Sequence, residues 1–431
     1  MRRFAAVLVL LMAGCSSGTV GSTGTGSASS GSGSASGASS GSGGSGSSTG
    51  GSGSTGTGDT YLPWEGGPAY YAQWAHGPSS AADFFPIAVW LQSPGNASRY
   101  AAVGINTFVG LWQGPTDQQV ADLDAAGMPA ICDQAVDWAN HTDDANLLGW
   151  QQQDEPDNAQ SDGQGGYGPC VDPSAVQQVA ATFKANDSTR PVYLNLGQGA
   201  AWADYYGRGS ACAGVDDYAD YAVGSDILSF DIYPVNSTDP ETSGKLEYVA
   251  RGVDHLRQAT NFQKPVWTWI ETTGFNDPSH TPTPAQIRTE VWMALIHGAR
   301  GIGYFAHIFS PSFVEAGLLS VPASKAAVEQ IDAQVSALAP VLNEPPLANG
   351  ATVSSSDASV PVDILVKRHD GKLYVFAAAM RDGPTDATFT VRSPSEATIE
   401  VLGESRSLAL SGGSFTDHFD GYGVHLYEIS P

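Results

Sequence analysis

The chain has 431 residues, with 44 acidic and 19 basic side chains and a net charge of −25 at pH 7. All the acids lie beyond residue 58, so the part that can fold is even more acidic than the whole chain. Because nucleic acids are bound mainly through basic side chains on phosphate, this charge argues against a nucleic-acid partner. It fits a protein with a soluble, secreted surface.

Residues 1–14 have the pattern of a secretory signal peptide. Two arginines are followed by an apolar run that is too short to span a bilayer as a stable helix. The run ends in "LMAGC", which resembles the lipobox of bacterial lipoproteins, with Met12 where leucine is commoner. The resemblance implies cleavage before Cys15, lipidation of its thiol and a lipid anchor in the membrane of a bacterial cell envelope or cell surface. An ordinary signal peptide with a chance cysteine, and hence a secreted protein, is the alternative.

Residues 15–58 follow as a segment made almost only of Ser, Gly, Thr and Ala. Such a composition cannot bury a core, so we expect a flexible tether. Beyond it stand three further cysteines, of which Cys132 lies in a strand-like run. Cys170 and Cys212 lie in loop-like sequence, and in an oxidising compartment we expect these two to form a disulfide.

From residue 84 to 307 the chain repeats one alternation of a short apolar run, a loop and, usually, a helical pattern. The apolar runs cover 84–92, 105–112, 129–134, 147–155, 191–198, 227–234, 265–272 and 301–307. The helical patterns include 116–127, 173–186, 245–260, 283–299 and 324–342, with capping residues at Thr116, Asp172 and Thr283. Eight strand–helix units predict a (β/α)8 TIM barrel over 59–345. The alternative, an open doubly wound sheet, lacks a glycine-rich phosphate loop after its first strand.

Strand periodicity predicts which side chains point into the barrel. The aliphatic face of each strand should meet the helices, so the polar and aromatic face points inward. On this count Glu155 and Glu271 point inward at the C-terminal ends of the fourth and seventh strands, where barrel active sites lie, and Asp154 is off-phase.

After residue 345 the pattern changes to short alternating strands with turn signals, in the stretches 362–380, 386–393, 397–403 and 423–430. These predict a small β-sandwich over 346–431. We interpret it as a structural accessory to the barrel, with carbohydrate binding as the alternative.

The two glutamates suit the cleavage of a glycosidic bond, which needs a proton on the leaving oxygen and support for a cationic sugar carbon. Glu271 would be the nucleophile of a double displacement, and Glu155 the acid and then the base. Other inward groups could bind sugar hydroxyls or hold the nucleophile: Asn195, Asp231, Tyr233 and His307. Four rings could stack on sugar faces: Trp90, Trp112, Trp267 and Trp269. Packing in the core is the alternative for each of them, and for Trp267 it is the interpretation that we favour.

Short motifs at the strand ends carry a family resemblance: "DEP" after the fourth strand, "DIYP" on the sixth, "WIET" on the seventh and "GARGIGYFAH" on the eighth. Together with the β-rich C-terminal sequence they resemble the clan of retaining (β/α)8 glycoside hydrolases that includes cellulase-, mannanase- and β-galactosidase-like families. The resemblance covers 84–431 and implies a carbohydrate substrate, Glu155 as acid/base and Glu271 as nucleophile. The clan usually has Asn before the acid/base, and Asp154 in its place leaves open a different hydroxyl pattern or a lost activity.

Two other classes of function stay open at this point. One is a non-catalytic surface protein that binds carbohydrate through a hydrolase-like barrel. The other is a metal-dependent barrel hydrolase or lyase, which would need clustered His and Asp ligands; His307 lies on a strand, but no second ligand stands near it in the sequence. The sequence contains no C-x-x-C or H-E-x-x-H motif. We expect a monomer without metal or cofactor.

Overall fold

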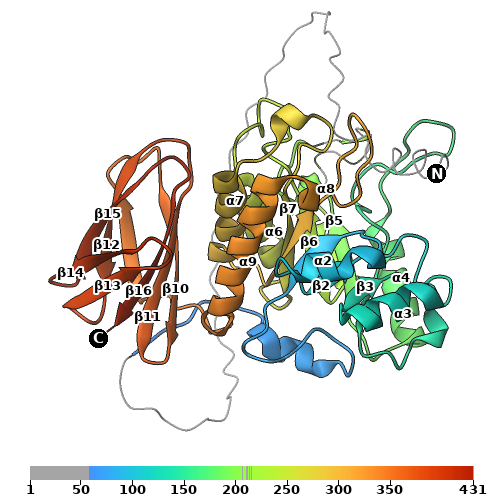
Figure 1. The fold of residues 1–431 in the computed structure, drawn as a ribbon, viewed down its shortest axis with the longest axis horizontal. Coiled ribbons are helices and arrows are strands. Elements are labelled where there is room, and N and C mark those ends of the chain that lie inside the picture. Colours follow the sequence, from blue (N-terminus) through green and yellow to red (C-terminus); the bar gives the residue numbers. More distant parts are fainter. Residues whose placement is uncertain (1–57, 206, 210–211, 213, 215, 431) are drawn as a thin grey trace, which may run out of the picture.

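The computed structural model describes residues 58–430 except 206, 210, 211, 213 and 215. The predicted signal peptide, Cys15 and nearly all of the tether lie outside the described residues. Figure 1 shows a barrel wrapped by helices, with an antiparallel β domain beside it. Within the described part of the chain, no helix combines the length and the apolar character needed to cross a membrane.

The barrel is closed by eight parallel strands that pair in chain order, with β8 pairing back to β1. The strands are β1 (Ile87–Trp90), β2 (Thr107–Val109), β3 (Ala130–Cys132), β4 (Leu147–Gln151), β5 (Val192–Leu196), β6 (Ile227–Asp231), β7 (Val266–Glu271) and β8 (Gly301–Phe305). Each lies inside one of the predicted apolar runs. The predicted TIM barrel is therefore confirmed, and the doubly wound alternative is excluded.

Helices cover the outside of the barrel. The α-helices are α2 (Ala97–Ala101), α3 (Asp117–Ala126), α4 (Pro173–Asn186), α5 (Tyr218–Val223), α6 (Tyr248–Ala259), α7 (Pro284–Ile296), α8 (Gly317–Ser320) and α9 (Pro322–Leu342). Short 3-10 turns are η2 (Gly67–Gln73), η3 (Pro94–Asn96), η4 (Trp138–Asn140), η5 (Gln198–Ala200) and η7 (Pro278–His280). The expected caps form: Thr116, Asp172 and Thr283 each accept a hydrogen bond from a first-turn backbone N–H.

The barrel interior is filled by aromatic rings at its N-terminal end. Trp267 donates a 3.1 Å hydrogen bond to Tyr71 of η2, which closes that end from below. A Cβ at Gly303 of β8 would stand only 2.2 Å from the Trp269 ring, so glycine is needed for the indole to cross the barrel. Trp267 is therefore a core residue.

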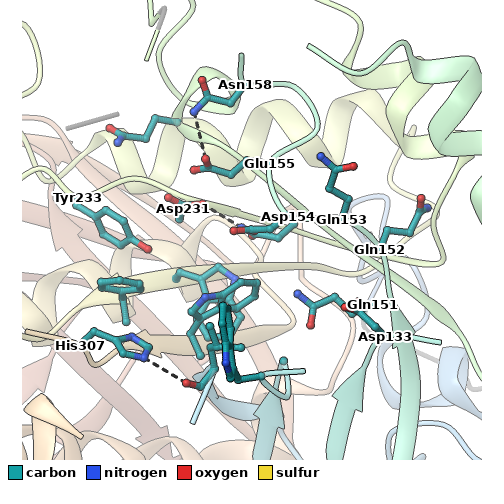
Figure 2. Close-up of a pocket in the computed structure, with 18 of the residues that line it drawn as sticks. Asp133, Gln151, Gln152, Gln153, Asp154, Glu155, Asn158, Asp231, Tyr233 and His307 are labelled. Atoms are coloured by element: carbon teal, nitrogen blue, oxygen red, sulfur yellow. Dashed lines mark hydrogen bonds between the residues drawn. The ribbon is translucent and has the colours of Figure 1, made fainter. Parts of the chain in front are cut away.

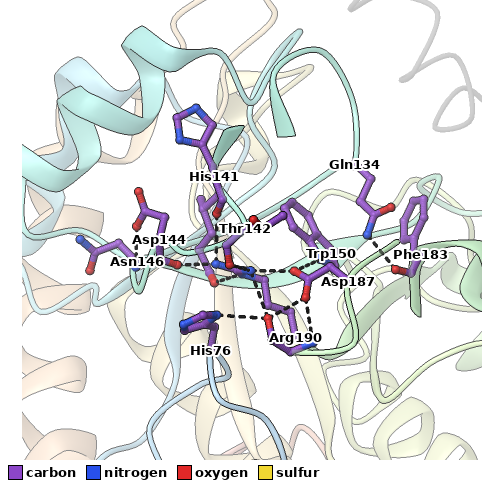
Figure 3. A network of polar contacts seen from close by, with 12 residues as sticks. His76, Gln134, His141, Thr142, Asp144, Asn146, Trp150, Phe183, Asp187 and Arg190 are labelled. Carbon is purple, nitrogen blue, oxygen red and sulfur yellow. Dashed lines mark hydrogen bonds and ion pairs between the residues drawn. The ribbon is translucent and has the colours of Figure 1, made fainter. Parts of the chain in front are cut away.

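A buried arginine fixes the start of β4 (Figure 3). Arg190 is fully buried and donates to the backbone carbonyls of Leu147 and Thr142, at 2.6 and 2.7 Å, and to the Asp187 carboxylate at 2.6 Å. Asp187 also accepts a 3.0 Å hydrogen bond from the Trp150 indole of β4. Both members of this buried ion pair thus have further hydrogen-bond partners, as buried charges require. The same hydrogen bonds fix the position of β4.

The C-terminal domain is a sandwich of a five-stranded sheet, ordered β10-β11-β16-β13-β14, and a three-stranded sheet, ordered β15-β12-β9. Its strands are β9 (Ala351–Ser355), β10 (Val362–His369), β11 (Lys372–Ala379), β12 (Thr385–Val391), β13 (Ala397–Val401), β14 (Arg406–Leu410), β15 (Ser414–Phe419) and β16 (Val424–Ser430). The predicted sandwich is confirmed, although the sequence stretches did not include β9, β14 and β15. It packs on the barrel through rings such as Trp292 of α7 and Phe376 of β11, whose centroids are 5.3 Å apart.

The predicted disulfide is absent. Cys170 and Cys212 are free, as is Cys132. The two loop cysteines do lie side by side. Burial and a hydrogen bond with Cys170 raise the pKa of the Cys212 thiol to about 12.

Candidate active site

A cavity of about 270 Å³ opens at the C-terminal end of the barrel (Figure 2). Carboxylic acids from three strand ends line it together with aromatic rings and amides. The acids are Asp133 after β3, Asp154 and Glu155 after β4, and Asp231 at the end of β6. The cavity brings together nine of the predicted site residues: Trp90, Trp112, Asp154, Glu155, Asn195, Asp231, Tyr233, Trp269 and His307.

Glu271, which the sequence analysis predicts to be the nucleophile, does not line this cavity. The side chain is fully buried. Its carboxylate accepts backbone N–H bonds from Val235 and Asn236, at 2.6 and 2.8 Å, and a 2.5 Å bond from the Asn236 side chain. These donors in the loop after β6 hold the carboxylate in the barrel wall, away from the substrate space.

A second buried carboxyl group faces Glu271 from outside the barrel. Glu290 of α7 is fully buried next to Glu271, and neither of its carboxyl oxygens has a hydrogen-bond donor among the described residues. Burial raises the pKa of Glu271 to about 7 and holds the pKa of Glu290 well above its usual range. Two buried carboxyl groups in contact retain at least one proton, so this pair carries at most one negative charge.

The loop after β4 brings both of its acids into the cavity. The strand ends at Gln151, so strand alternation does not extend to Asp154, and the prediction that Asp154 is off-phase is wrong. Glu155 has a φ of 45°, a left-handed conformation that turns the chain at this point. Asp157 anchors the turn, because it accepts a 2.8 Å bond from the Gly197 N–H and a 3.2 Å bond from the Tyr218 hydroxyl.

Asn195 of β5 joins two of the cavity acids. Its Nδ2 donates to Asp154 Oδ1 at 2.9 Å and to Asp231 Oδ1 at 3.0 Å. The two accepting oxygens therefore lie at most about 5.9 Å apart, the sum of the two hydrogen-bond lengths. A single amide nitrogen therefore holds the two carboxyl groups close together at the mouth of the barrel.

The orientation of the Asn195 amide is fixed from below. Its Oδ1 accepts a 2.6 Å hydrogen bond from Ser229 Oγ. Ser229 in turn accepts bonds from the Tyr193 hydroxyl at 2.5 Å and from the Trp269 indole at 3.2 Å. Because Ser229 uses its single proton on Asn195, the amide nitrogen must face the two acids.

The electrostatic environment favours a proton on this pair of acids. Burial, reinforced by the nearby charge of Glu155, raises the pKa of Asp154 to about 7. The same causes, with Asp154 added, hold the pKa of Asp231 well above its usual range. Glu155 itself contacts the Arg208 guanidinium and accepts a 3.1 Å bond from the Asn158 side chain. One acid of the Asp154–Asp231 pair can therefore be protonated near neutral pH while the other is ionised.

Aromatic rings and a neutral imidazole complete the walls. The Trp90 and Trp269 rings meet edge to face at 5.0 Å, and Tyr233 packs against Phe305 at 5.2 Å. Burial lowers the pKa of His307 to about 4, so its ring is neutral near pH 7. Its Nε2 lies 3.2 Å from the Leu91 carbonyl and serves as the donor there.

Several lining residues escaped the sequence analysis. Asp133 follows β3 directly, so the rule that active sites lie at strand ends would have identified it. Arg208 and Tyr205 come from the long segment between β5 and α5, which has no periodic pattern to place it. Within the described ranges, no group of three or more His, Cys, Asp or Glu side chains is arranged to hold a metal ion.

Comparison with known proteins supports the architecture. No family model and no curated protein matches the sequence. Among solved structures, the α-amylase of Geobacillus thermoleovorans in complex with acarbose shares 9% identity at a TM-score of 0.50, covering 81% of this chain and 99% of that one. The α-galactosidase I of Mortierella vinacea shares 11% identity at a TM-score of 0.50, covering 81% and 97%. At these identities the likeness concerns the fold alone, and in fold the chain resembles (β/α)8 glycoside hydrolases, as its motifs predicted.

Proposed function

We propose that this protein is a glycoside hydrolase that cleaves O-glycosidic bonds through Asp154 and Asp231. The observation that carries the proposal is the sharing of one amide by two cavity carboxyl groups. Their accepting oxygens lie at most about 5.9 Å apart, which is below the roughly 6.5–9.5 Å of inverting enzymes and compatible with the roughly 5–5.5 Å of enzymes that retain anomeric configuration.

The two acids have distinct roles in the proposed reaction. Asp231, the more deeply buried of the two, protonates the leaving oxygen, and Asp154 attacks the anomeric carbon to form a glycosyl ester. The Asp231 carboxylate then takes a proton from water as that water attacks the same carbon, which releases the sugar and restores Asp154. The second step returns the proton that the first step used, so the cycle is balanced.

Glu155 acts on this pair through its charge. Glu155 forms an ion pair with the Arg208 guanidinium. Its negative charge raises the pKa of both Asp154 and Asp231 and stabilises a cationic sugar in the transition state. The sequence analysis predicted that Glu155 is the acid/base. In this proposal Glu155 instead acts only through its charge.

Turnover of a glycoside panel tests the proposal. Wild type is offered aryl glycosides of common hexoses and pentoses in both anomeric forms, with Asp154→Asn and Asp231→Asn as matched variants. We expect release of aryl alcohol from at least one glycoside by wild type and a loss of at least about 10³-fold in each variant. Absence of turnover on every glycoside and oligosaccharide would instead favour a barrel that binds carbohydrate without cleaving it.

We further propose that the protein is exported and anchored through a lipid on Cys15. The support is the "LMAGC" motif followed by a Ser/Gly/Thr-rich tether. Fractionation of cells that express wild type or Cys15→Ser tests it: wild type should partition with membranes and the variant should not. A wild-type protein found only in the soluble fraction would contradict the anchor.

A further inference from the structure

A second groove adjoins the catalytic cavity on the side of β1, β2 and β8. It has a volume of about 410 Å³ and shares Leu91, Trp112, Gln113 and His307 with the wall of the cavity. We call it the β1–β8 groove. Because the two spaces share these four residues, they lie next to one another at the mouth of the barrel.

The rim of the groove carries an exposed aromatic ring. Phe313, between β8 and α8, is 44% exposed. Its ring stacks on Phe309 and on His307, with centroids 5.8 and 5.9 Å away and planes within 28° and 17°. The ring is thus packed on two other rings while part of it stays exposed, so it can present apolar surface to a ligand.

The floor of the groove contains an acceptor without a partner. Gln92 is 2% exposed, and its Nε2 donates to the carbonyls of Trp90 and Glu315 at 3.2 and 3.0 Å. Its Oε1 has no hydrogen-bond partner among the residues that the structure describes. A buried acceptor left unpaired costs free energy that a ligand hydroxyl would recover. This side chain is therefore an independent sign of a polar ligand.

The groove wall is held in place before any ligand binds. The Glu315 carboxylate accepts bonds from the backbone N–H and the hydroxyl of Ser93, both at 2.7 Å, and from the Asn96 side chain at 3.3 Å. These contacts tie the segment that carries Phe313 to the segment after β1. A preformed groove loses little entropy when it binds a ligand.

The charge of the groove and the cavity selects against acidic ligands. No Lys or Arg is among the groove residues, and Glu315 adds a negative charge. In the cavity, four carboxylic acids accompany Arg208, whose guanidinium is engaged by Glu155. An anionic sugar such as a uronic acid would meet uncompensated negative charge in both spaces.

We infer that the β1–β8 groove is a second sugar subsite and that the substrate is an uncharged oligosaccharide or polysaccharide spanning cavity and groove. One sugar ring would lie on Phe313 with a hydroxyl directed at Gln92, and the bond cleaved would lie beside Asp154. The inference rests on the proposed function, because it takes the neighbouring cavity as the place of cleavage.

Affinity electrophoresis tests the subsite without relying on turnover. All proteins carry Asp154→Asn so that the gel polysaccharide is not degraded. The gels contain β-glucan, arabinoxylan, galactomannan or soluble starch as neutral probes, and polygalacturonate or alginate as acidic ones. Phe313→Ala is compared with Tyr61→Ala, an exposed ring of 53% exposure that lies beside Leu347, far from the groove.

We expect at least one neutral polysaccharide to retard the parent protein, with an affinity that Phe313→Ala lowers about tenfold and Tyr61→Ala leaves unchanged. Retardation by the acidic probes alone, equal affinity of Phe313→Ala and parent, or no retardation by any probe would overturn the inference. These experiments test the subsite and the proposed function independently. Turnover of aryl glycosides without polysaccharide binding would support the hydrolase activity and contradict the subsite. Binding that depends on Phe313 without any turnover would support the subsite and contradict the hydrolase activity.

Discussion

At the scale of single residues, the site depends on how Asn195 divides one amide between two acids. If Asp231 is the acid and base, Asp231→Ala should still form the glycosyl ester from an aryl glycoside with a good leaving group, because such a substrate needs little proton donation. The ester should then accumulate, and azide, which needs no base, should release it as a glycosyl azide of unchanged anomeric configuration. Product analysis by NMR checks this. If azide fails to accelerate the variant, Asp231 is not the acid and base.

A second prediction concerns the effect of the Glu155 charge on the pH dependence of the reaction. The reaction needs Asp154 ionised and Asp231 protonated, so kcat/KM should fall below about pH 7 as Asp154 takes up a proton, and fall again at higher pH as Asp231 loses one. Glu155→Gln removes a negative neighbour that raises both pKa values, so both limbs of the profile should move to lower pH. A pH profile of the variant checks this. A variant with no activity at any pH, together with azide rescue of Glu155→Ala, would make Glu155 the proton donor.

At the scale of elements, the contact between β7 and α7 buries two carboxyl groups. A carboxyl group whose pKa is raised on folding contributes stability below its unfolded pKa and loses that contribution as the pH rises through its folded pKa. For Glu271 this window runs from about 4.5 to about 7, and for Glu290 it extends higher. Glu290→Gln removes one titrating group, so the gain in Tm of the variant over wild type should grow between pH 5 and pH 8.

The expected gain at pH 8 is several degrees, since each kcal/mol shifts Tm by roughly 2–4 °C in a protein of this size class. Calorimetry at both pH values measures it. Glu329→Gln is the matched control, because Glu329 lies exposed on α9 in an i, i+4 ion pair with Lys325. A pH-independent difference, or a loss of stability in Glu290→Gln at pH 8, would show that the two carboxyl groups do not share a proton.

At the scale of the whole molecule, barrel and sandwich share one hydrophobic core across α7 and β11. We therefore expect a single thermal transition. Phe376→Ala, in the interface, and Phe389→Ala, inside the sandwich, should each reduce the free energy of unfolding by roughly 3–5 kcal/mol. Both variants should therefore shift this single transition to a lower temperature. Two resolved transitions in wild type, only one of which responds to Phe389→Ala, would show that the domains unfold independently.

Local sequence patterns predicted most of the fold but only part of the candidate site. Strand and helix periods are local, so the eight barrel strands and the caps at Thr116 and Thr283 were predictable. Alternation also placed Trp269 and Asp231 correctly, because both lie within regular strands. It does not extend to Asp154, which lies beyond the end of β4, and it could not show that the Glu271 carboxylate accepts hydrogen bonds from backbone amides of a different loop. Where loops and strand ends decide a side chain's direction, tertiary contacts outweigh the period.

In the proposed reaction Asp154 forms a covalent bond to the sugar. Incubation with an activated 2-deoxy-2-fluoro glycoside of the preferred sugar should trap this ester, because the fluorine slows its hydrolysis more than its formation. Peptide mapping by mass spectrometry should then find the sugar on the peptide that contains Asp154, and none in Asp154→Asn. A label on Glu155 or Glu271, or no label together with a first-formed product of inverted configuration, would contradict the account.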